Sequence, residues 1–320
     1  MEIKKLKIAF YGAPEFAAGV LKDIVEDNEI PVEVRLVVTQ PDRPVGRKQT
    51  ITPTPVKKMA LEKNISIFDD LKSETVKSKL KDVDLVLLYA FGEIIPSEII
   101  KIPRWGFWNI HPSLLPLYRG PSPISYPLFL GDKKTGVSLI SMDEHLDHGP
   151  IIAQEEYIIQ QNDTRNSLEN RLSKIGYKLF KEYVQLLRDG AIHSNEQNHL
   201  QATNTRLLTK KDGFVPFSIF NSILKGEVLQ QESIPPILKE YSAKYHRPFP
   251  DSNTSAIYYL LFRAFSPWPG LWTIVPLPTG DKRLKITNME MKEGKPMITK
   301  VQLEGKKEVD IETFRRAYSI

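Results

Sequence analysis

An amide and an imidazole stand two residues apart in this sequence, and a carboxylate follows further along the chain. Asn109 and His111 close the run Phe107–His111, whose composition is typical of a β-strand. Residues two apart on a strand point to the same face of the sheet, so both side chains would enter one crevice. Asp147 could orient the imidazole or accept a proton from a nucleophile. The three residues predict acid–base chemistry at one site, with a hydrogen-bonded structural histidine as the alternative for His111.

The segment around Asp147 contains other polar residues that allow different interpretations. Asp143, His145 and His148 could ligate a metal ion together with Asp147, but their spacing matches no metal-binding motif. An ordinary acidic turn is a second alternative. Gly149-Pro150 indicates a tightly formed loop, which favours Asp147 as the functional carboxylate, and we expect no metal.

A long loop, Thr39–Pro55, follows the predicted strand Val32–Val38. A structureless loop of this length inside a compact domain is uncommon and often functional. This one carries Arg43, Arg47 and Lys48 among four prolines. We therefore expect a basic arm at the mouth of the crevice, with a disordered surface insertion as the alternative.

The first two hundred residues alternate short β-branched runs with amphipathic stretches, which is typical of parallel βαβ units. The expected strands are Lys7–Tyr11, Val32–Val38, Leu85–Tyr89, Phe107–His111, Gly136–Met142 and Ile151–Ile159, and the expected helices are Phe16–Glu26, Pro55–Lys63, Ser73–Leu80 and Ser167–Arg188. We therefore predict an α/β domain over residues 1–190 with a doubly wound, mainly parallel, Rossmann-like sheet. The carboxyl ends of parallel strands are where ligands bind, so we expect the crevice at that edge.

The rest of the chain predicts a smaller second domain. The polar stretch 191–205 is expected to be a linker, and the second domain is expected to span 206–320. Its short strands, separated by glycine-containing turns, suit a small antiparallel barrel. They are Leu271–Val275, Leu284–Ile286, Met297–Leu303 and Val309–Ile311. The proline-punctuated stretch Gly226–Ser252 is expected to be mostly an extra loop.

Several cofactor classes are disfavoured by what the sequence lacks. Gly12-Ala13-Pro14 follows the first strand, where a dinucleotide-binding fold would place a G-x-G-x-x-G turn, but the second and third glycines are replaced by Pro14 and Phe16. NAD and FAD are therefore not expected. The chain has no cysteine, which excludes disulfides, thiolate zinc sites and cysteine nucleophiles.

Composition and charge indicate a globular protein with a basic extension. Of the 320 residues 41% are hydrophobic and 26% charged, and no run of about eighteen apolar residues occurs. We expect a cytoplasmic protein without membrane contact. Residues 201–320 contain 18 Lys and Arg against 12 Asp and Glu, whereas residues 1–200 are nearly neutral. This distribution fits a polyanionic partner, and a solvated surface with a small charge surplus is the alternative.

Together these segments resemble the formyltransferase family that uses 10-formyltetrahydrofolate, and the resemblance runs nearly end to end. The motifs that carry it are Tyr11-Gly12-Ala13-Pro14-Glu15-Phe16-Ala17, the arm Val37-Val38-Thr39-Gln40-Pro41-Asp42-Arg43-Pro44, the core Asn109-Ile110-His111-Pro112-Ser113-Leu114-Leu115-Pro116 and the turn Leu146-Asp147-His148-Gly149. The arm is the most specific of these motifs, because it is similar to an insertion that contacts initiator tRNA.

The resemblance implies a catalytic triad of Asn109, His111 and Asp147. Within it, the amide and the imidazole would donate hydrogen bonds to the oxyanion of a tetrahedral intermediate. The implied co-substrate is 10-formyltetrahydrofolate. The residues implied to line its pocket are Tyr89, Ala90, Phe91, Gly92, Ile94, Ile95, Pro96, Ser113, Leu114, Leu115, Pro116 and Asp143.

For the acceptor, the resemblance implies initiator methionyl-tRNA. Arg43, Arg47 and Lys48 of the arm would contact it, together with an OB-like C-terminal domain that helps to bind tRNA. We expect a monomer with neither a metal nor NAD. Two alternatives remain: an N-formyltransferase that modifies the amine of a nucleotide sugar with the same donor, and a catalytically inactive RNA-binding homologue.

Overall fold

The computed structural model describes residues 5–46, 48–227, 229–249, 254–318 and 320 of the chain. The chain divides into two compact units. Unit 1 consists of Met1–Pro123, Thr135–Ile158 and Glu169–Thr205, and unit 2 consists of Ile124–Lys134, Ile159–Leu168 and Arg206–Ile320. Each unit contains a β-sheet of its own.

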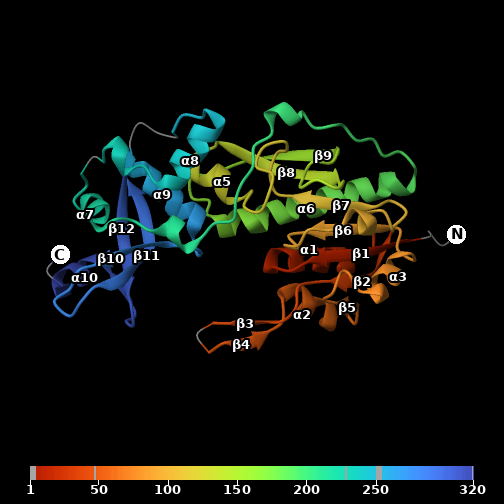
Figure 1. Ribbon diagram of the computed structural model, residues 1–320, viewed down its shortest axis with the longest axis horizontal. Coiled ribbons are helices and arrows are strands. Elements are labelled where there is room, and N and C mark those ends of the chain that lie inside the picture. The colour runs from red at the N-terminus through yellow and green to blue at the C-terminus, as the bar shows by residue number, and fades with distance from the viewer. Residues whose placement is uncertain (1–4, 47, 228, 250–253, 319) are drawn as a thin grey trace. The chain divides into compact units, whose positions relative to one another are not determined.

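Unit 1 is built on a seven-stranded sheet of order β5-β2-β1-β6-β7-β8-β9 (Figure 1). Its strands are β1 (Leu6–Gly12), β2 (Val32–Val38), β5 (Ser66–Phe68), β6 (Leu85–Tyr89), β7 (Phe107–His111), β8 (Lys134–Ser141) and β9 (Ile151–Ile158). β1 pairs in parallel with β2 and β6, and β6 pairs in parallel with β7, whereas β8 is antiparallel to β7. The mainly parallel, Rossmann-like fold predicted from the sequence is confirmed.

The helices of this part of the chain are α1 (Glu15–Glu26), α2 (Pro55–Glu62), α3 (Glu74–Leu80), α4 (Ser97–Ile100) and α6 (Arg165–Arg188). Side-chain hydroxyls cap the first turns of α2 and α3. The Thr54 hydroxyl accepts the amide hydrogen of Lys57 in α2, and the Ser73 hydroxyl accepts that of Val76 in α3. These contacts satisfy amides that have no partner within a helix. No helix in the described ranges is long and apolar enough to cross a membrane.

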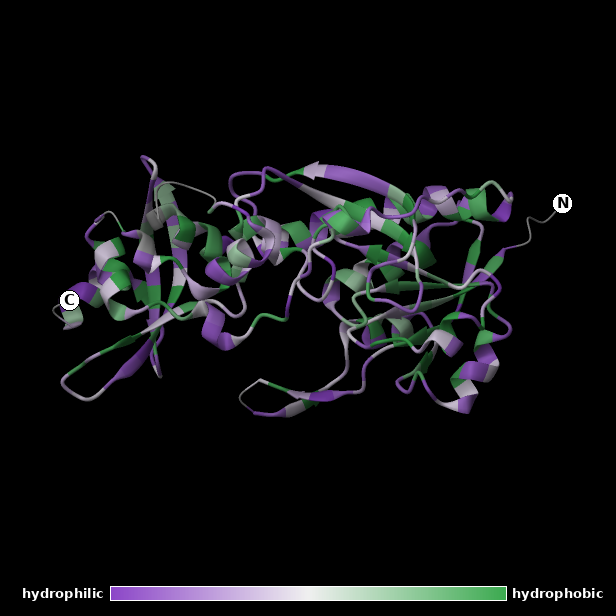
Figure 2. Cartoon of the chain, turned by 45° about the horizontal axis from the view of Figure 1, so that its top comes forward, coloured by the Kyte–Doolittle hydropathy of each residue, from purple (hydrophilic) through white to green (hydrophobic). Residues whose placement is uncertain are grey.

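The middle of the sheet is a continuous apolar layer. Every residue of β6 and β7 is buried, as expected for parallel strands covered on both faces, and Figure 2 colours the middle of this sheet as hydrophobic. Gly12 ends β1 where an added Cβ would lie 2.8 Å from the Tyr89 carbonyl oxygen and 2.9 Å from the Phe10 ring. Close packing against β6 therefore explains this glycine without any bound phosphate.

The arm at Thr39–Pro55 contains regular structure, so the expectation of a structureless loop is wrong. β3 (Arg43–Val45) and β4 (Thr50–Thr52) pair as an antiparallel hairpin that projects from the sheet of unit 1 (Figure 1). Gly46 and Gln49 have φ values of +73° and +50°. These left-handed residues reverse the chain, and the Val, Ile and Thr side chains beside them favour strands.

Unit 2 contains a four-stranded antiparallel sheet of order β10-β11-β12-β13, which confirms the predicted antiparallel β module. The strands are β10 (Leu271–Val275), β11 (Lys282–Lys292), β12 (Lys295–Leu303) and β13 (Glu308–Asp310). The helices are α5 (Ser125–Phe129), α7 (Phe217–Leu224), α8 (Pro236–Tyr245), α9 (Thr254–Phe265) and α10 (Ile311–Tyr318). Short 3₁₀ turns occur at His199–Gln201 in unit 1 and at Lys210–Gly213 and Gln231–Ser233 in unit 2. The terminal helix α10 has no counterpart in the sequence-based expectation.

The stretch Gly226–Ser252 includes a ten-residue helix, α8, which corrects its interpretation as mostly loop. Its prolines mark the beginning of the helix: Pro235 is the N-cap and Pro236 occupies the first turn. Proline is tolerated there because the first amide groups of a helix have no intrahelical partner. Tyr241 is buried and packs 5.4 Å from the ring of Tyr126, so the helix belongs to the core of unit 2.

Candidate active site

The amide, the imidazole and the carboxylate singled out in the sequence meet in unit 1. Asn109 Nδ2 donates to Asp147 Oδ1 over 3.1 Å, and His111 Nδ1 lies 3.5 Å from the same oxygen. The side chains of His111 and Asp147 are only 4% and 8% exposed. Asn109 and His111 therefore share one face of β7, and the carboxylate of Asp147 lies between them in a largely water-free setting.

The route by which Asp147 reaches this position differs from the expectation of a shared carboxyl edge. β8 is antiparallel to β7, and its last residue, Ser141, pairs with Trp108 near the beginning of β7. The loop after β8 therefore starts beside the first residues of β7. It must turn back along that strand to bring Asp147 to Asn109 and His111.

A tight turn presents the Asp147 carboxylate. The φ angle of Asp147 is +50°, a left-handed conformation that costs a residue with a side chain roughly 1–2 kcal/mol. The amide hydrogen of Gly120 is donated to Asp147 Oδ2 over 2.7 Å. At Gly149 an added Cβ would lie 1.9 Å from the Ser141 carbonyl oxygen. Only glycine fits at this position while the turn keeps its present path.

His111 has an acceptor facing each ring nitrogen. Nε2 lies 3.0 Å from the carbonyl oxygen of Tyr118, and Nδ1 faces Asp147. A carbonyl and a carboxylate can only accept, so the doubly protonated imidazolium satisfies both contacts at once. Asn109 uses one amide hydrogen for Asp147, and its second has no partner among the described residues. That second hydrogen can serve a bound ligand.

The loop after β7 is held by its own hydrogen bonds. The Ser113 hydroxyl donates to the Leu117 carbonyl over 2.7 Å, and the Ser138 hydroxyl donates to the Ser113 carbonyl over 2.7 Å. The Leu115 amide in turn donates to Ser138 Oγ over 3.0 Å. Of the predicted pocket residues in this loop, Ser113 and Leu115 are buried, whereas Leu114 and Pro116 are half-buried.

The other predicted pocket stretch, residues 89–96, turns most of its large side chains into the protein. Tyr89 is fully buried and its hydroxyl lies 3.1 Å from Ser173 Oγ, while Phe91 and Ile95 belong to the core. Ala90 and Gly92 have φ values of +50° and +82°. Ile94 is 84% exposed, and Pro96 caps α4. A ligand at this stretch would therefore meet mainly backbone and the exposed side chains of Glu93 and Ile94.

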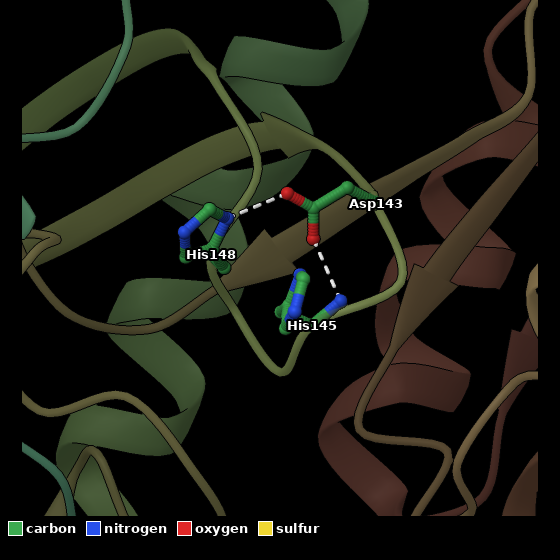
Figure 3. Close-up of side chains that lie close together, drawn as sticks. All are labelled: Asp143, His145 and His148. Atoms are coloured by element: carbon green, nitrogen blue, oxygen red, sulfur yellow. Dashed lines mark hydrogen bonds and ion pairs between the residues drawn. The ribbon is translucent and has the colours of Figure 1, made fainter.

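Asp143, His145 and His148 form a small cluster, with candidate metal-ligand atoms within 4.8 Å of one another (Figure 3). His148 Nδ1 lies 2.6 Å from Asp143 Oδ2, and the backbone amide of His145 donates to Asp143 Oδ1 over 2.8 Å. Burial by itself raises the pKa of Asp143, but the hydrogen bonds from His148 and His145 outweigh burial, and the pKa lies below its usual value. The two hydrogen bonds hold the carboxylate of Asp143 against the His148 ring and the backbone of His145.

The residues predicted to bind tRNA lie on the hairpin or fall outside the described residues. Arg43 lies on β3 and Lys48 in the turn; both are exposed and neither forms an ion pair with another described residue. Arg47 lies outside the residues that the structure describes. Val45 and Ile51 of the same hairpin are 56% and 61% exposed, so the hairpin presents a basic surface with apolar side chains among the charges.

Two residues that the sequence analysis did not assign to the site support the turn: Gln197 contacts it directly, and Arg119 contacts Gln197. Gln197 Nε2 donates to the carbonyl oxygens of Asp147 and Gly149 over 2.9 and 2.8 Å. Arg119 donates to Gln197 Oε1 over 2.6 Å. Gln197 lies in the polar stretch expected to be a linker, where nothing in the local pattern indicates a partner fifty residues away.

Comparison with known proteins agrees with this geometry. Residues 6–184 match the family described as Formyl transferase, and the chain belongs to that family. The methionyl-tRNA formyltransferase of Caldicellulosiruptor saccharolyticus is 32% identical, with 98% of each chain covered. The enzyme of the same name from Thermotoga neapolitana is 38% identical over 72% of this chain and 74% of its own length.

Solved structures of formyltransferases share the fold. A 4-N formyltransferase from Francisella tularensis has a TM-score of 0.59 at 18% identity, covering 86% of this chain and 94% of its own. An N-formyltransferase from Helicobacter canadensis, in complex with folinic acid and dTDP-3-aminofucose, has a TM-score of 0.55 at 18% identity, covering 95% of this chain and 98% of its own.

Proposed function

We propose that this chain transfers the formyl group of 10-formyltetrahydrofolate to the α-amino group of initiator methionyl-tRNA. The observation that carries the proposal is the meeting of Asn109, His111 and Asp147 in a chain that is 32% identical, end to end, to a methionyl-tRNA formyltransferase. Folinic acid in the Helicobacter canadensis protein supports a reduced folate as the donor.

Formyl transfer to an amine requires a neutral nucleophile, a polarised carbonyl and a path for one proton. An α-amino group has a pKa of about 7.7–8.0, so a useful fraction is neutral near pH 7 and needs placing more than activating. The amine nitrogen attacks the formyl carbon, and the carbonyl oxygen becomes an oxyanion. The bond from that carbon to the folate nitrogen then breaks, and the nitrogen takes up a proton.

The three side chains suit these steps. Asn109 has an uncommitted amide hydrogen for the oxyanion, and a ring N–H of His111 can donate a second hydrogen bond if the ring turns from Asp147 or Tyr118. Preorganised donors of this kind are typically worth about 10²- to 10³-fold in rate. Asp147 orients the imidazole and accepts the proton that the amine releases, directly or through water.

The acceptor has two candidates, each favoured by a specific observation. The similarity to methionyl-tRNA formyltransferases over nearly the whole chain favours tRNA, as does the exposed basic hairpin with Arg43 and Lys48. The Helicobacter canadensis protein, solved with dTDP-3-aminofucose, makes a nucleotide-sugar amine the second candidate, but at 18% identity that likeness shows only the fold. The intact set of three side chains argues against a catalytically inactive RNA-binding homologue.

The decisive experiment is labelled formyl transfer from 10-formyltetrahydrofolate to charged initiator tRNA, with a nucleotide-amino-sugar as the competing acceptor. Asn109→Ala, His111→Ala and Asp147→Asn should each lower turnover about 10²-fold or more while the protein stays folded. His193→Ala, at an exposed histidine outside the site, serves as the matched control and should leave turnover unchanged. Turnover only with the sugar would reject tRNA as the acceptor, and wild-type turnover in a triad variant would remove that residue from its role.

A further inference from the structure

The stretch 195–205 is bound to both segments that form the candidate site. Asn195 exchanges two backbone hydrogen bonds of 2.8 Å with Ile151, next to the Asp147 turn. At the other end of the stretch, the Thr203 carbonyl accepts the backbone amide hydrogen of Arg119 over 2.8 Å. Arg119 lies in the loop after β7, directly before Gly120. This stretch therefore ties the loop after β7 to the loop after β8.

Two side chains of this stretch reach the Asp147 turn: the His199 ring stacks on the His148 ring at 3.9 Å between centroids, and Gln197 forms hydrogen bonds with the backbone. Gln197 is 5% exposed, and its Nε2 contacts the carbonyl oxygens of Asp147 and Gly149. Carbonyl oxygens can only accept, and the guanidinium of Arg119 on the other side can only donate. The amide therefore has a single orientation that satisfies all of its contacts, with the nitrogen on the turn and the oxygen on Arg119.

Arg119 is an unusual anchor because its charge is buried without a carboxylate in contact. The residue is 7% exposed and makes no ion pair with any described residue. Its guanidinium donates instead to Gln197 Oε1 over 2.6 and 3.2 Å and to His199 Nδ1 over 2.8 Å. A buried charge is costly unless its hydrogen bonds are made, so Arg119 holds Gln197 firmly in place.

The dipeptide Arg119-Gly120 therefore supports Asp147 at two points, its carboxylate and its backbone carbonyl. Gly120, directly after Arg119, donates its amide hydrogen to the carboxylate of Asp147. Arg119 acts on the backbone of the same residue through Gln197. The contacts form a closed ring from Arg119 through Gln197, Asp147 and Gly120 back to Arg119, around a residue in the left-handed conformation.

We propose that Gln197, anchored on Arg119, is a positioning residue for formyl transfer: its amide holds the turn that presents the Asp147 carboxylate to Asn109 and His111. The proposal rests on the proposed function, because it assigns Gln197 to the reaction that Asp147 would serve. It gives the stretch 195–205, which lies within the predicted linker, a part in the geometry of the site.

Two substitutions test the hydrogen bonds separately from the shape of the side chain. Gln197→Met keeps the length of the side chain and removes both donors. Gln197→Glu keeps the contact with Arg119 but turns an acceptor toward two carbonyl oxygens. Because a misplacement of about 1 Å can cost on the order of 10²-fold in rate, each variant should lower kcat at least tenfold. The KM values for folate and tRNA should change by less than about threefold, because Gln197 touches neither substrate.

Gln302→Met is the matched control, since Gln302 also donates to a backbone carbonyl, that of Lys306 over 3.0 Å, at a turn in unit 2. It should retain the wild-type kcat. Hydrogen exchange of the amides in residues 143–149, measured on the full chain at a temperature where every variant is folded, should be at least tenfold faster in both Gln197 variants and unchanged in the control.

The exchange measurement separates the two hypotheses. If wild-type protein formylates neither acceptor but exchange accelerates in the Gln197 variants, the proposed function fails and the hold on the turn survives. Active variants with wild-type kcat, or unchanged exchange at 143–149, would overturn the positioning role. A fall in kcat that disappears once turnover is divided by the folded fraction of each variant would assign Gln197 to overall stability instead.

Discussion

Gly149→Ala tests how closely the Asp147 turn must be held. A Cβ at this position would lie 1.9 Å from the Ser141 carbonyl oxygen and 3.2 Å from the Asp143 amide nitrogen, both backbone atoms. Real Cβ atoms essentially never approach within 3.0 Å of another heavy atom. The backbone of the turn must therefore move by about 1 Å, which can cost on the order of 10²-fold in kcat.

The same displacement should be visible in stability. Forcing an extra carbon into a closely packed position costs about 1–3 kcal/mol, so the melting temperature of Gly149→Ala should fall without loss of cooperativity. Gly19→Ala is the matched control, because Gly19 lies in α1 and an added Cβ there has no heavy atom within 4 Å. That variant should gain roughly 0.5–1 kcal/mol and keep the wild-type kcat.

The assay is steady-state formyl transfer with saturating folate and charged initiator tRNA, together with thermal unfolding of each variant. A folded Gly149→Ala protein with wild-type kcat would refute the reasoning. It would mean that the position of Asp147 does not depend on the path of the turn, and the inferred role of Gln197 would lose its physical basis as well.

Two further predictions concern acid stability and tRNA binding. A hydrogen bond from Lys181 lowers the pKa of Asp27 to about 2, below its unfolded value of about 3.9, so its ionised form stabilises the fold above about pH 4 and that contribution is lost as the pH falls toward 2. Asp27→Asn should therefore lower the melting temperature at pH 6 more than at pH 2.5, and an equal loss at both values would contradict the assignment. If Arg43 and Lys48 contact phosphates, replacing both by glutamine should reduce the slope of log affinity for tRNA against log salt concentration by about 1 to 2; an unchanged slope would exclude them from the interface.

Local patterns were sufficient for most of unit 1. The alternation of apolar strands and amphipathic helices predicted β1, β2, β6 and β7 within one or two residues of their observed ends, because burial on both faces leaves a strong signature in sequence. The two-residue period of a strand also predicted that Asn109 and His111 share a face. Their meeting with Asp147 is a feature of the structure, and their catalytic roles stay predictions until turnover is measured.

Proline and glycine were less reliable signals for the boundary between regular elements and loops. Pro235 and Pro236 look like breakers in sequence, yet they begin α8, because proline fits the first turn of a helix as well as a loop. The hairpin β3–β4 was hidden for a similar reason. Its strands have three residues each, too few for a period to be recognised, and only their pairing distinguishes them from an irregular loop.

The sequence by itself determined which residue types carry the chemistry and which strand presents two of them, since these depend on side-chain identity and a short local period. Only the tertiary structure decided that β8 runs antiparallel to β7, that the loop after it turns back, and that Gln197 and Arg119 hold the Asp147 turn. Those contacts join residues fifty and seventy-eight positions apart. Hydrogen bonds over such separations depend on how the whole chain packs, and no local pattern encodes them.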